Sequence, residues 1–170
     1  MDPLAETLSW IGTGGAVWLA LACIFALLWR RPGLLFWVGA ADLVAYLASE
    51  GLKQAVERRR PSQLFPEIKT LVPLPHGSSF PSGHATTSFA CAVVLASVAR
   101  TRRARALLLA LATLIALSRL YVGVHFPLDV IAGAALGAAI GLTLSALVNP
   151  SSNFFGRFYQ ARRDDAERGQ

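Results

Sequence analysis

Long runs of apolar residues constrain this chain more than any other feature of its sequence. Four runs hold almost no charged residues, and they cover Trp10 to Trp29, Leu34 to Leu52, Gly83 to Ala99 and Val130 to Val148. A helix needs about 20 apolar residues to cross the hydrocarbon core of a membrane. A fifth run, Ala106 to Ser118, is shorter, and it spans only if the helix continues through Arg119 toward Val124. We therefore expect a polytopic transmembrane protein with about five spans.

The overall composition supports a helical membrane protein. Hydrophobic residues make up 54% of the chain and charged residues 15%, against roughly 25% charged residues in an average soluble protein. The runs are rich in Ala and Leu, which favour helices, and none shows the alternation of a barrel strand. We predict an all-α transmembrane helix bundle that forms a single domain over residues 1–170, with a basic tail over about 151–170.

The net charge of +6 is compatible with nucleic-acid binding, so the positions of the basic residues decide between the two interpretations. Ten of the sixteen Lys and Arg residues follow the first, third and fifth runs. Short loops rich in Lys and Arg stay on the cytoplasmic side. This distribution predicts an outside N-terminus, a cytoplasmic C-terminus and extracytoplasmic segments at 53–82 and 119–129. The charge is explained by topology, and no nucleic-acid partner is expected.

Six basic residues nevertheless fall in the two outward segments: Lys53, Arg58, Arg59, Arg60, Lys69 and Arg119. Their presence against the usual rule indicates an anion site. If the second span continues as a helix, Lys53 and Arg60 lie on one face about two turns apart, and Pro61 ends the helix. The interpretation for Arg58, Arg59 and Lys69 is contact with solvent or lipid head groups.

Two histidines lie on the same outward side as these cations. His125 and Asp129 are four residues apart in the second segment, a spacing that lets a carboxylate hold one ring nitrogen and leave the other free to react. His84 stands at the start of the third run, directly after Ser82 and Gly83. Two histidines beside several cations favour chemistry on a phosphate ester.

Three stretches carry a resemblance to a known family. They are "KQAVERRRP" at 53–61, "PSGH" at 81–84 and "SRLYVGVHFPLD" at 118–129. Together they resemble the three-part signature of the type 2 phosphatidic acid phosphatase superfamily, in order and with its internal spacings. The resemblance implies a lipid phosphate phosphatase of a bacterial inner membrane, without a metal or other cofactor. Bacterial membrane members commonly have six spans, whereas five are counted here. Either a span is absent at the N-terminus, or the Pro-rich segment 61–80, which is also a candidate lid, contributes membrane-inserted structure.

The resemblance also implies a role for each matching residue. His125 attacks phosphorus to give a phosphohistidine, and Asp129 holds its imidazole. His84 protonates the leaving oxygen and then takes a proton from water. The phosphate-binding residues implied are Lys53, Arg60, Ser82, Gly83 and Arg119. Ser82 and Gly83 suit this role because a helix N-terminus offers N–H groups and partial positive charge to an anion.

A phosphate site at the outer membrane face predicts a membrane lipid phosphate as substrate. Undecaprenyl diphosphate is the first expectation, because its turnover on that face suits the topology. The alternatives are phosphatidylglycerophosphate and phosphatidic acid. A vanadate-dependent haloperoxidase and a non-catalytic membrane protein are alternatives from other classes; haloperoxidase relatives are soluble and larger, and a scaffold needs no such group of histidines and cations.

Two features lie outside the signature. Asp42, near the middle of the second run, is costly in a membrane, at about 2.5 to 3.5 kcal/mol or more. It is interpreted as a structural residue of the bundle, with a place in the substrate cavity as the alternative. Gly133, Gly137 and Gly141 recur every four residues and allow close helix packing. Packing within one chain is favoured over a homodimer through this glycine face.

Overall fold

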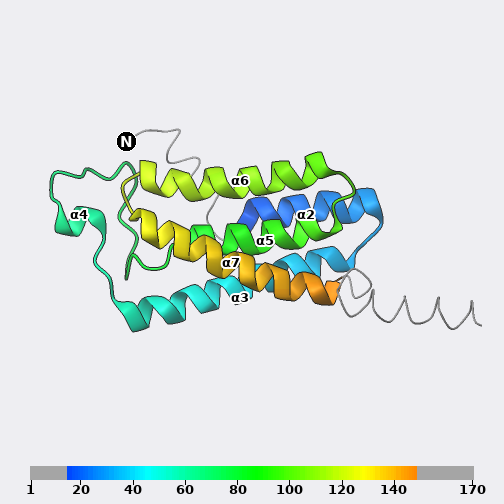
Figure 1. Cartoon of the computed structure of the whole chain (residues 1–170), viewed down its shortest axis with the longest axis horizontal. Coiled ribbons are helices and arrows are strands. Elements are labelled where there is room, and N and C mark those ends of the chain that lie inside the picture. Colours follow the sequence, from blue (N-terminus) through cyan, green and yellow to red (C-terminus); the bar gives the residue numbers. More distant parts are fainter. Residues whose placement is uncertain (1–14, 149–170) are drawn as a thin grey trace, which may run out of the picture.

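The structure is a computed structural model, and it describes residues 15–148. This part of the chain is helical, without strands. The helices are α2 (Ala16–Trp29), α3 (Gly33–Val56), the short α4 (Pro61–Leu64), α5 (Gly83–Val98), α6 (Arg102–Tyr121) and α7 (Pro127–Val148). The expected all-α bundle is confirmed, and the five apolar runs correspond to the five long helices (Figure 1). The beginning of the first run and the basic tail lie outside the described residues.

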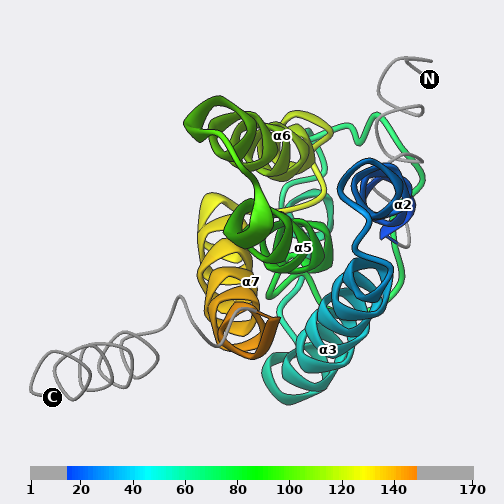
Figure 2. The ribbon, with the colours of Figure 1, turned by 90° about the vertical axis from the view of Figure 1, so that its right-hand side faces the viewer.

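Helix α5 forms the centre of the bundle. It is surrounded by α3, α6 and α7, and α2 packs beside α3 and also contacts α5 (Figure 2). Small side chains suit this position: Ala90, Cys91 and Ala92 are fully buried. The helix begins at Gly83 with Ser82 as its N-cap residue, as the sequence predicts. The "PSGH" motif therefore lies where the central helix begins.

Helices α5 and α7 pack so closely that their contact requires glycine. A Cβ atom added at Gly133 would lie 2.6 Å from the Ser82 carbonyl oxygen, and one at Gly141 would lie 2.7 Å from that of Ala90. A Cβ at Gly137 would collide with the Thr86 carbonyl group. The three glycines are buried within one chain. Their face is covered by α5, which agrees with packing within one chain.

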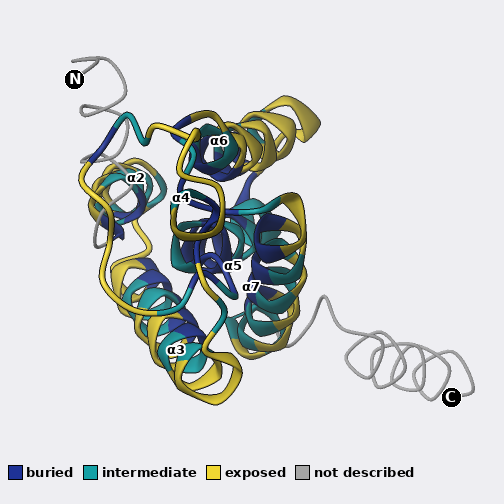
Figure 3. Ribbon diagram, turned by 90° about the vertical axis from the view of Figure 1, so that its left-hand side faces the viewer, coloured by how far each residue is buried: buried dark blue, intermediate teal, exposed yellow. Residues whose placement is uncertain are grey.

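The outer surface of the bundle is apolar. Leu27 is 76% exposed, Phe36 69% and Leu107 70%, and the outward faces of α3 and α6 are exposed in Figure 3. Three segments are long and apolar enough to cross a membrane: Gly33–Leu64, which includes α3, together with α6 and α7. Helices α2 and α5 are apolar but shorter. Helix α6 extends through Arg119. The fifth run therefore forms a helix long enough to span the membrane, as it would only if it continued past this residue.

The loops fall at the two ends of the bundle as their order predicts. The turn at 30–32 and the loop at 99–101 lie at one end, whereas segments 57–82 and 122–126 share the other (Figure 1). Segment 61–80 holds only the four-residue helix α4 and irregular chain, so it supplies no sixth spanning helix. It is attached to the bundle by a hydrogen bond from the Leu71 N–H to the Val122 carbonyl oxygen (3.2 Å) and by burial of Val72.

The expected single helix carrying both Lys53 and Arg60 is wrong. Helix α3 ends at Val56, and Glu57 adopts a left-handed conformation with φ 47°. Arg60 is extended and precedes α4, in which Pro61 is the first residue. Proline fits the first turn of a helix because it has no N–H group to leave unpaired. Pro61 therefore begins a helix here, four residues after the previous one has ended.

Candidate active site

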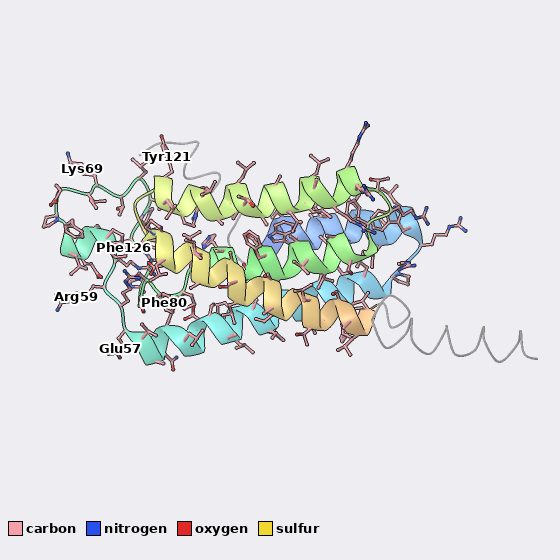
Figure 4. All side chains as sticks on the ribbon, in the orientation of Figure 1. Glu57, Arg59, Lys69, Phe80, Tyr121 and Phe126 are labelled. Carbon is pink, nitrogen blue, oxygen red and sulfur yellow. The ribbon has the colours of Figure 1, made fainter. Side chains whose placement is uncertain are left out.

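The motif residues converge at the end of the bundle where segments 57–82 and 122–126 meet. The end of α3, the start of α5, the end of α6 and the start of α7 all open toward this end (Figure 1). In Figure 4, Phe80 and Phe126 lie between α4 and the start of α7, while Arg59 and Lys69 extend from the outer edge. Exposed Arg59 and Lys69 agree with their interpretation as solvated cations.

His125 is held mainly by a backbone carbonyl group. Its Nδ1 lies 2.7 Å from the Ser79 carbonyl oxygen and 3.7 Å from Asp129 Oδ2. A carbonyl oxygen only accepts hydrogen bonds, so Nδ1 carries the proton and Nε2 carries the lone pair. The sequence assigns this choice of tautomer to Asp129. In the structure Ser79 makes the closer contact, and the carboxylate supports it electrostatically.

The surroundings of His125 favour its neutral form. Burial lowers the pKa of His125 from its usual range, and the positive charge of Arg60 lowers it further. The hydrogen bond and charge of Asp129 and the carbonyl group of Ser79 act in the opposite direction, but burial dominates. At neutral pH the imidazole is therefore uncharged, with a nucleophilic lone pair on Nε2.

Asp129 is completely buried and joins three parts of the site. Its Oδ1 accepts a hydrogen bond from Arg58 Nη1 at 2.7 Å, and its Oδ2 accepts one from the Phe126 N–H at 2.9 Å. Its carbonyl oxygen accepts from the Ser82 N–H at 2.9 Å. Arg58 also lies over the Phe126 ring, with 4.5 Å from the guanidinium carbon to the ring centroid. Arg58 is thus part of the site, contrary to the solvent-contact interpretation from sequence.

Arg60 connects segments rather than facing an open space. It is 1% exposed. Its guanidinium group donates to four carbonyl oxygens, those of Val124 (3.1 Å), Ser78 (3.1 Å), Gly77 (3.3 Å) and His76 (3.4 Å). Because Val124 precedes His125 and Ser78 precedes Ser79, this one side chain fixes both ends of the contact that orients the imidazole.

The start of α5 presents donors toward Lys53. A Cβ atom added at Gly83 would lie 3.5 Å from Lys53 Nζ and 3.6 Å from Ser49 Oγ, so the ammonium group lies close to the backbone there. Lys53 also pairs with Glu50 at 2.6 Å. The Ser82 hydroxyl is buried, and within residues 15–148 it has no hydrogen-bond partner. A donor hydroxyl, a helix N-terminus and an ammonium group together suit an anion.

Arg119 lies in the last turn of α6, 2% exposed, with Nη2 2.9 Å from Ser118 Oγ. Its guanidinium group therefore lies inside the bundle, at the same end as the loop that carries His125.

His84 lies in the first turn of α5 and lines a groove of about 540 Å³ with Lys53 and Gly83. This groove runs between α2, α3 and α5, and it begins at Lys53, Gly83 and His84.

A second cavity, of about 440 Å³, lies on the outer side and is lined by polar residues that include Lys53, Arg58, Arg59 and Gln63. Lys53 borders both cavities. Within the described residues, no group of three His, Cys, Asp or Glu side chains is placed to hold a metal ion.

Comparisons with known proteins agree with this arrangement. A family model described as the PAP2 superfamily matches residues 33–152. The chain is 43% identical over 132 residues to decaprenylphosphoryl-5-phosphoribose phosphatase of Mycolicibacterium smegmatis, covering 76% of this chain and 69% of that protein. It is 32% identical to undecaprenyl-diphosphatase of Sulfolobus acidocaldarius over 124 residues, 73% of this chain and 60% of that protein. The crystal structure of Aquifex aeolicus LpxE superposes with a TM-score of 0.72 at 32% identity, over 84% of each chain.

Proposed function

This chain belongs to the PAP2 superfamily, and we propose that it is an integral membrane lipid phosphate phosphatase that works through a phosphohistidine on His125. The observation that carries the mechanism is the 2.7 Å contact between His125 Nδ1 and the Ser79 carbonyl oxygen. It fixes the proton on Nδ1 and leaves the Nε2 lone pair for in-line attack.

In the first step, Nε2 of His125 forms a bond to phosphorus while the bond from phosphorus to the leaving oxygen breaks. His84, at the start of α5, gives a proton to that oxygen. In the second step, His84 takes a proton from water, the water oxygen attacks phosphorus and the P–N bond breaks. Inorganic phosphate is released, and both histidines return to their starting state.

Positive charge and N–H groups stabilise the phosphoryl group during both steps. Lys53, Arg119, the Ser82 hydroxyl and the backbone at Gly83 are the groups placed to do so. Arg60 contributes its charge, but its hydrogen bonds to backbone carbonyls indicate that it mainly holds the loops. No divalent cation is required in this scheme, because these groups supply the charge that a metal would.

Two isoprenoid lipids are candidate substrates. Undecaprenyl diphosphate follows from the sequence interpretation and from the 32% identical undecaprenyl-diphosphatase. A lipid-linked pentose phosphate follows from the 43% identical decaprenylphosphoryl-5-phosphoribose phosphatase. Because His84 lines the groove between α2, α3 and α5, the leaving group of either substrate enters that groove.

The phosphohistidine is tested by rapid quenching in base with a lipid substrate carrying labelled phosphate, followed by peptide mapping at alkaline pH. We expect acid-labile, base-stable label on His125, and no label in His125→Ala. His84→Ala should still form it from a substrate with a good leaving group. His76→Ala is the matched control, since this histidine is exposed and outside the mechanism. Label on His84, or label that persists in His125→Ala, contradicts the scheme. Oxidation of bromide by added hydrogen peroxide in the presence of vanadate, without phosphate release, would instead indicate a haloperoxidase.

We further propose that the site faces the extracytoplasmic side, because ten basic residues mark the opposite side. Exposed Glu67 lies at the site end and exposed Arg103 at the other. In a Cys23→Ser background, an impermeant thiol reagent applied to intact cells should label Glu67→Cys and not Arg103→Cys. The reverse pattern would place the site in the cytoplasm.

A further inference from the structure

The wall that α3 contributes to the groove carries a row of polar residues beside the apolar Gly39 and Leu43. Four residues line it in turn along this helix: Asp42, Tyr46, Ser49 and Lys53. At 3.6 residues per turn, these positions fall within an arc of about 60° and extend over about 16 Å. An apolar spanning helix thus carries one continuous polar face, which begins beside the phosphate-binding region and continues toward the membrane interior. A purely hydrocarbon ligand has no polar groups that could form hydrogen bonds with such a face.

Asp42 is the most costly member of this face. A carboxylate in the middle of a spanning helix normally faces a cavity or a polar partner. Its Oδ1 atom is buried, and within residues 15–148 it has no hydrogen-bond partner. A side chain at Gly15, the N-cap residue of α2, would collide with the Asp42 carboxyl group. The carboxyl group thus lies against the N-terminal end of α2, and its Oδ1 atom has no donor among residues 15–148.

We propose that this polar face of α3 recognises a hydroxyl-rich leaving group, and that Asp42 is a specificity-determining residue that accepts a hydrogen bond from it. The inference rests on the proposed phosphatase activity and selects among its substrates. The leaving group begins at His84 and Lys53, and it passes Tyr46 before it reaches Asp42. The Ser49 hydroxyl is buried and donates to the Tyr46 carbonyl oxygen at 2.9 Å, so it supports the wall rather than binding the ligand. A sugar between the scissile phosphate and the lipid has this chemistry.

Charge in the groove disfavours the other candidate. Cleavage of undecaprenyl diphosphate expels a phosphate-bearing, anionic leaving group into the groove. Two carboxylates, Asp42 and Glu50, line it, and its one lysine is already paired with Glu50 at 2.6 Å. In a phosphomonoester on a lipid-linked sugar, the sugar separates the scissile phosphate from the phosphate of the lipid, so hydroxyl groups rather than a second phosphate lie next to the leaving oxygen, and these can donate to carboxylates.

The test compares substrates that differ in the leaving group. Purified protein is assayed for phosphate release from decaprenylphosphoryl-5-phosphoribose, undecaprenyl diphosphate and phosphatidic acid. We expect kcat/KM for the sugar substrate to exceed that for the other two by at least about tenfold. Loss of a hydrogen bond to a charged group corresponds to about 10- to 100-fold. Asp42→Ala should therefore lower kcat/KM for the sugar substrate by that factor, and for phosphatidic acid by less than about threefold.

Tyr46→Phe removes only a hydroxyl group, and it should lower activity on the sugar substrate alone. Tyr121→Phe is its matched control, since Tyr121 is 71% exposed and lies on α6. Equal losses on all substrates would make Asp42 a structural residue and overturn the inference. A wild-type protein active on all three without preference would also overturn it, whether or not the variants fold. Absence of phosphate release from every lipid would instead contradict the proposed function itself.

Discussion

Arg58→Ala should destabilise this protein although the side chain is one-third exposed. The arginine contacts Asp129 at 2.7 Å, and the carboxylate is completely buried. A hydrogen bond to a charged group is worth about 1.5 to 3 kcal/mol, which partial exposure of the arginine reduces to about 1 to 2 kcal/mol. The contact with the Phe126 ring adds about 0.5 to 1 kcal/mol. We expect a total loss of about 2 kcal/mol, or about 4 to 8 °C in Tm for a chain of this length.

Arg59→Ala is the matched control, because Arg59 is the adjacent residue, has the same side chain and is exposed. Both variants keep their backbone hydrogen bonds to segment 78–79. Arg59→Ala should change stability by less than about 0.5 kcal/mol. The two are compared by thermal unfolding in detergent and by kcat. Arg58→Ala should also lower kcat about tenfold or more, since small displacements of reacting groups are costly.

A double-mutant cycle with Asp129→Asn isolates the interaction between the two side chains. Coupling is expected because each partner's contribution depends on the other. If Arg58→Ala matches Arg59→Ala in both Tm and kcat, or if its effects simply add to those of Asp129→Asn, the assignment of Arg58 to the site is refuted.

Three further predictions concern pH, packing and metal ions. Because the pKa of His125 is lowered, kcat/KM should fall on the acidic side only at pH values below about 6.5, the usual pKa of an imidazole. Asp129→Asn removes a group that raises the pKa of His125, so the acidic limb of the pH profile should move to lower pH. A shift of this limb to higher pH would contradict the assignment. Gly137→Ala places a methyl group against a backbone carbonyl and should lower stability by about 1 to 3 kcal/mol, whereas Gly51→Ala, with open space around it, should be neutral or stabilising; equal Tm values would disprove the packing argument. Activity should survive EDTA, and a loss restored by magnesium or zinc would exclude the proposed mechanism.

The sequence predicts the parts of this fold and site that depend on residue type and spacing. Apolar length locates the five long helices, and the start of the central helix at Gly83 follows from the residues that precede it. The motifs alone indicate His125, His84 and Asp129 as candidate catalytic residues. These features are local, so neighbouring residues are enough to define them.

The features that the sequence does not reveal depend on distant contacts. Arg58 belongs to the site only because the chain brings it to Asp129, 71 residues away. The group that holds His125 is the carbonyl oxygen of Ser79, which any residue type would provide. Helix α3 ends at Val56, although no proline or glycine stands there to end it. By leaving the helix, the chain allows Arg60 to donate to the carbonyl oxygens of Val124 and Ser78. A pattern of side-chain types contains no signal for a backbone acceptor.

The glycine contact between α5 and α7 also determines how the two histidines can move. His84 is the second residue of one of these helices, and His125 lies two residues before the start of the other, with the Ser82 N–H bonded to the Asp129 carbonyl oxygen. Main chain touches main chain along this pair, so no flexible side chain lies between the helices to absorb a displacement. The proton donor and the nucleophile therefore travel together as one rigid body. A widening of the bundle beside the groove between α2, α3 and α5 would therefore leave the geometry of the reaction unchanged.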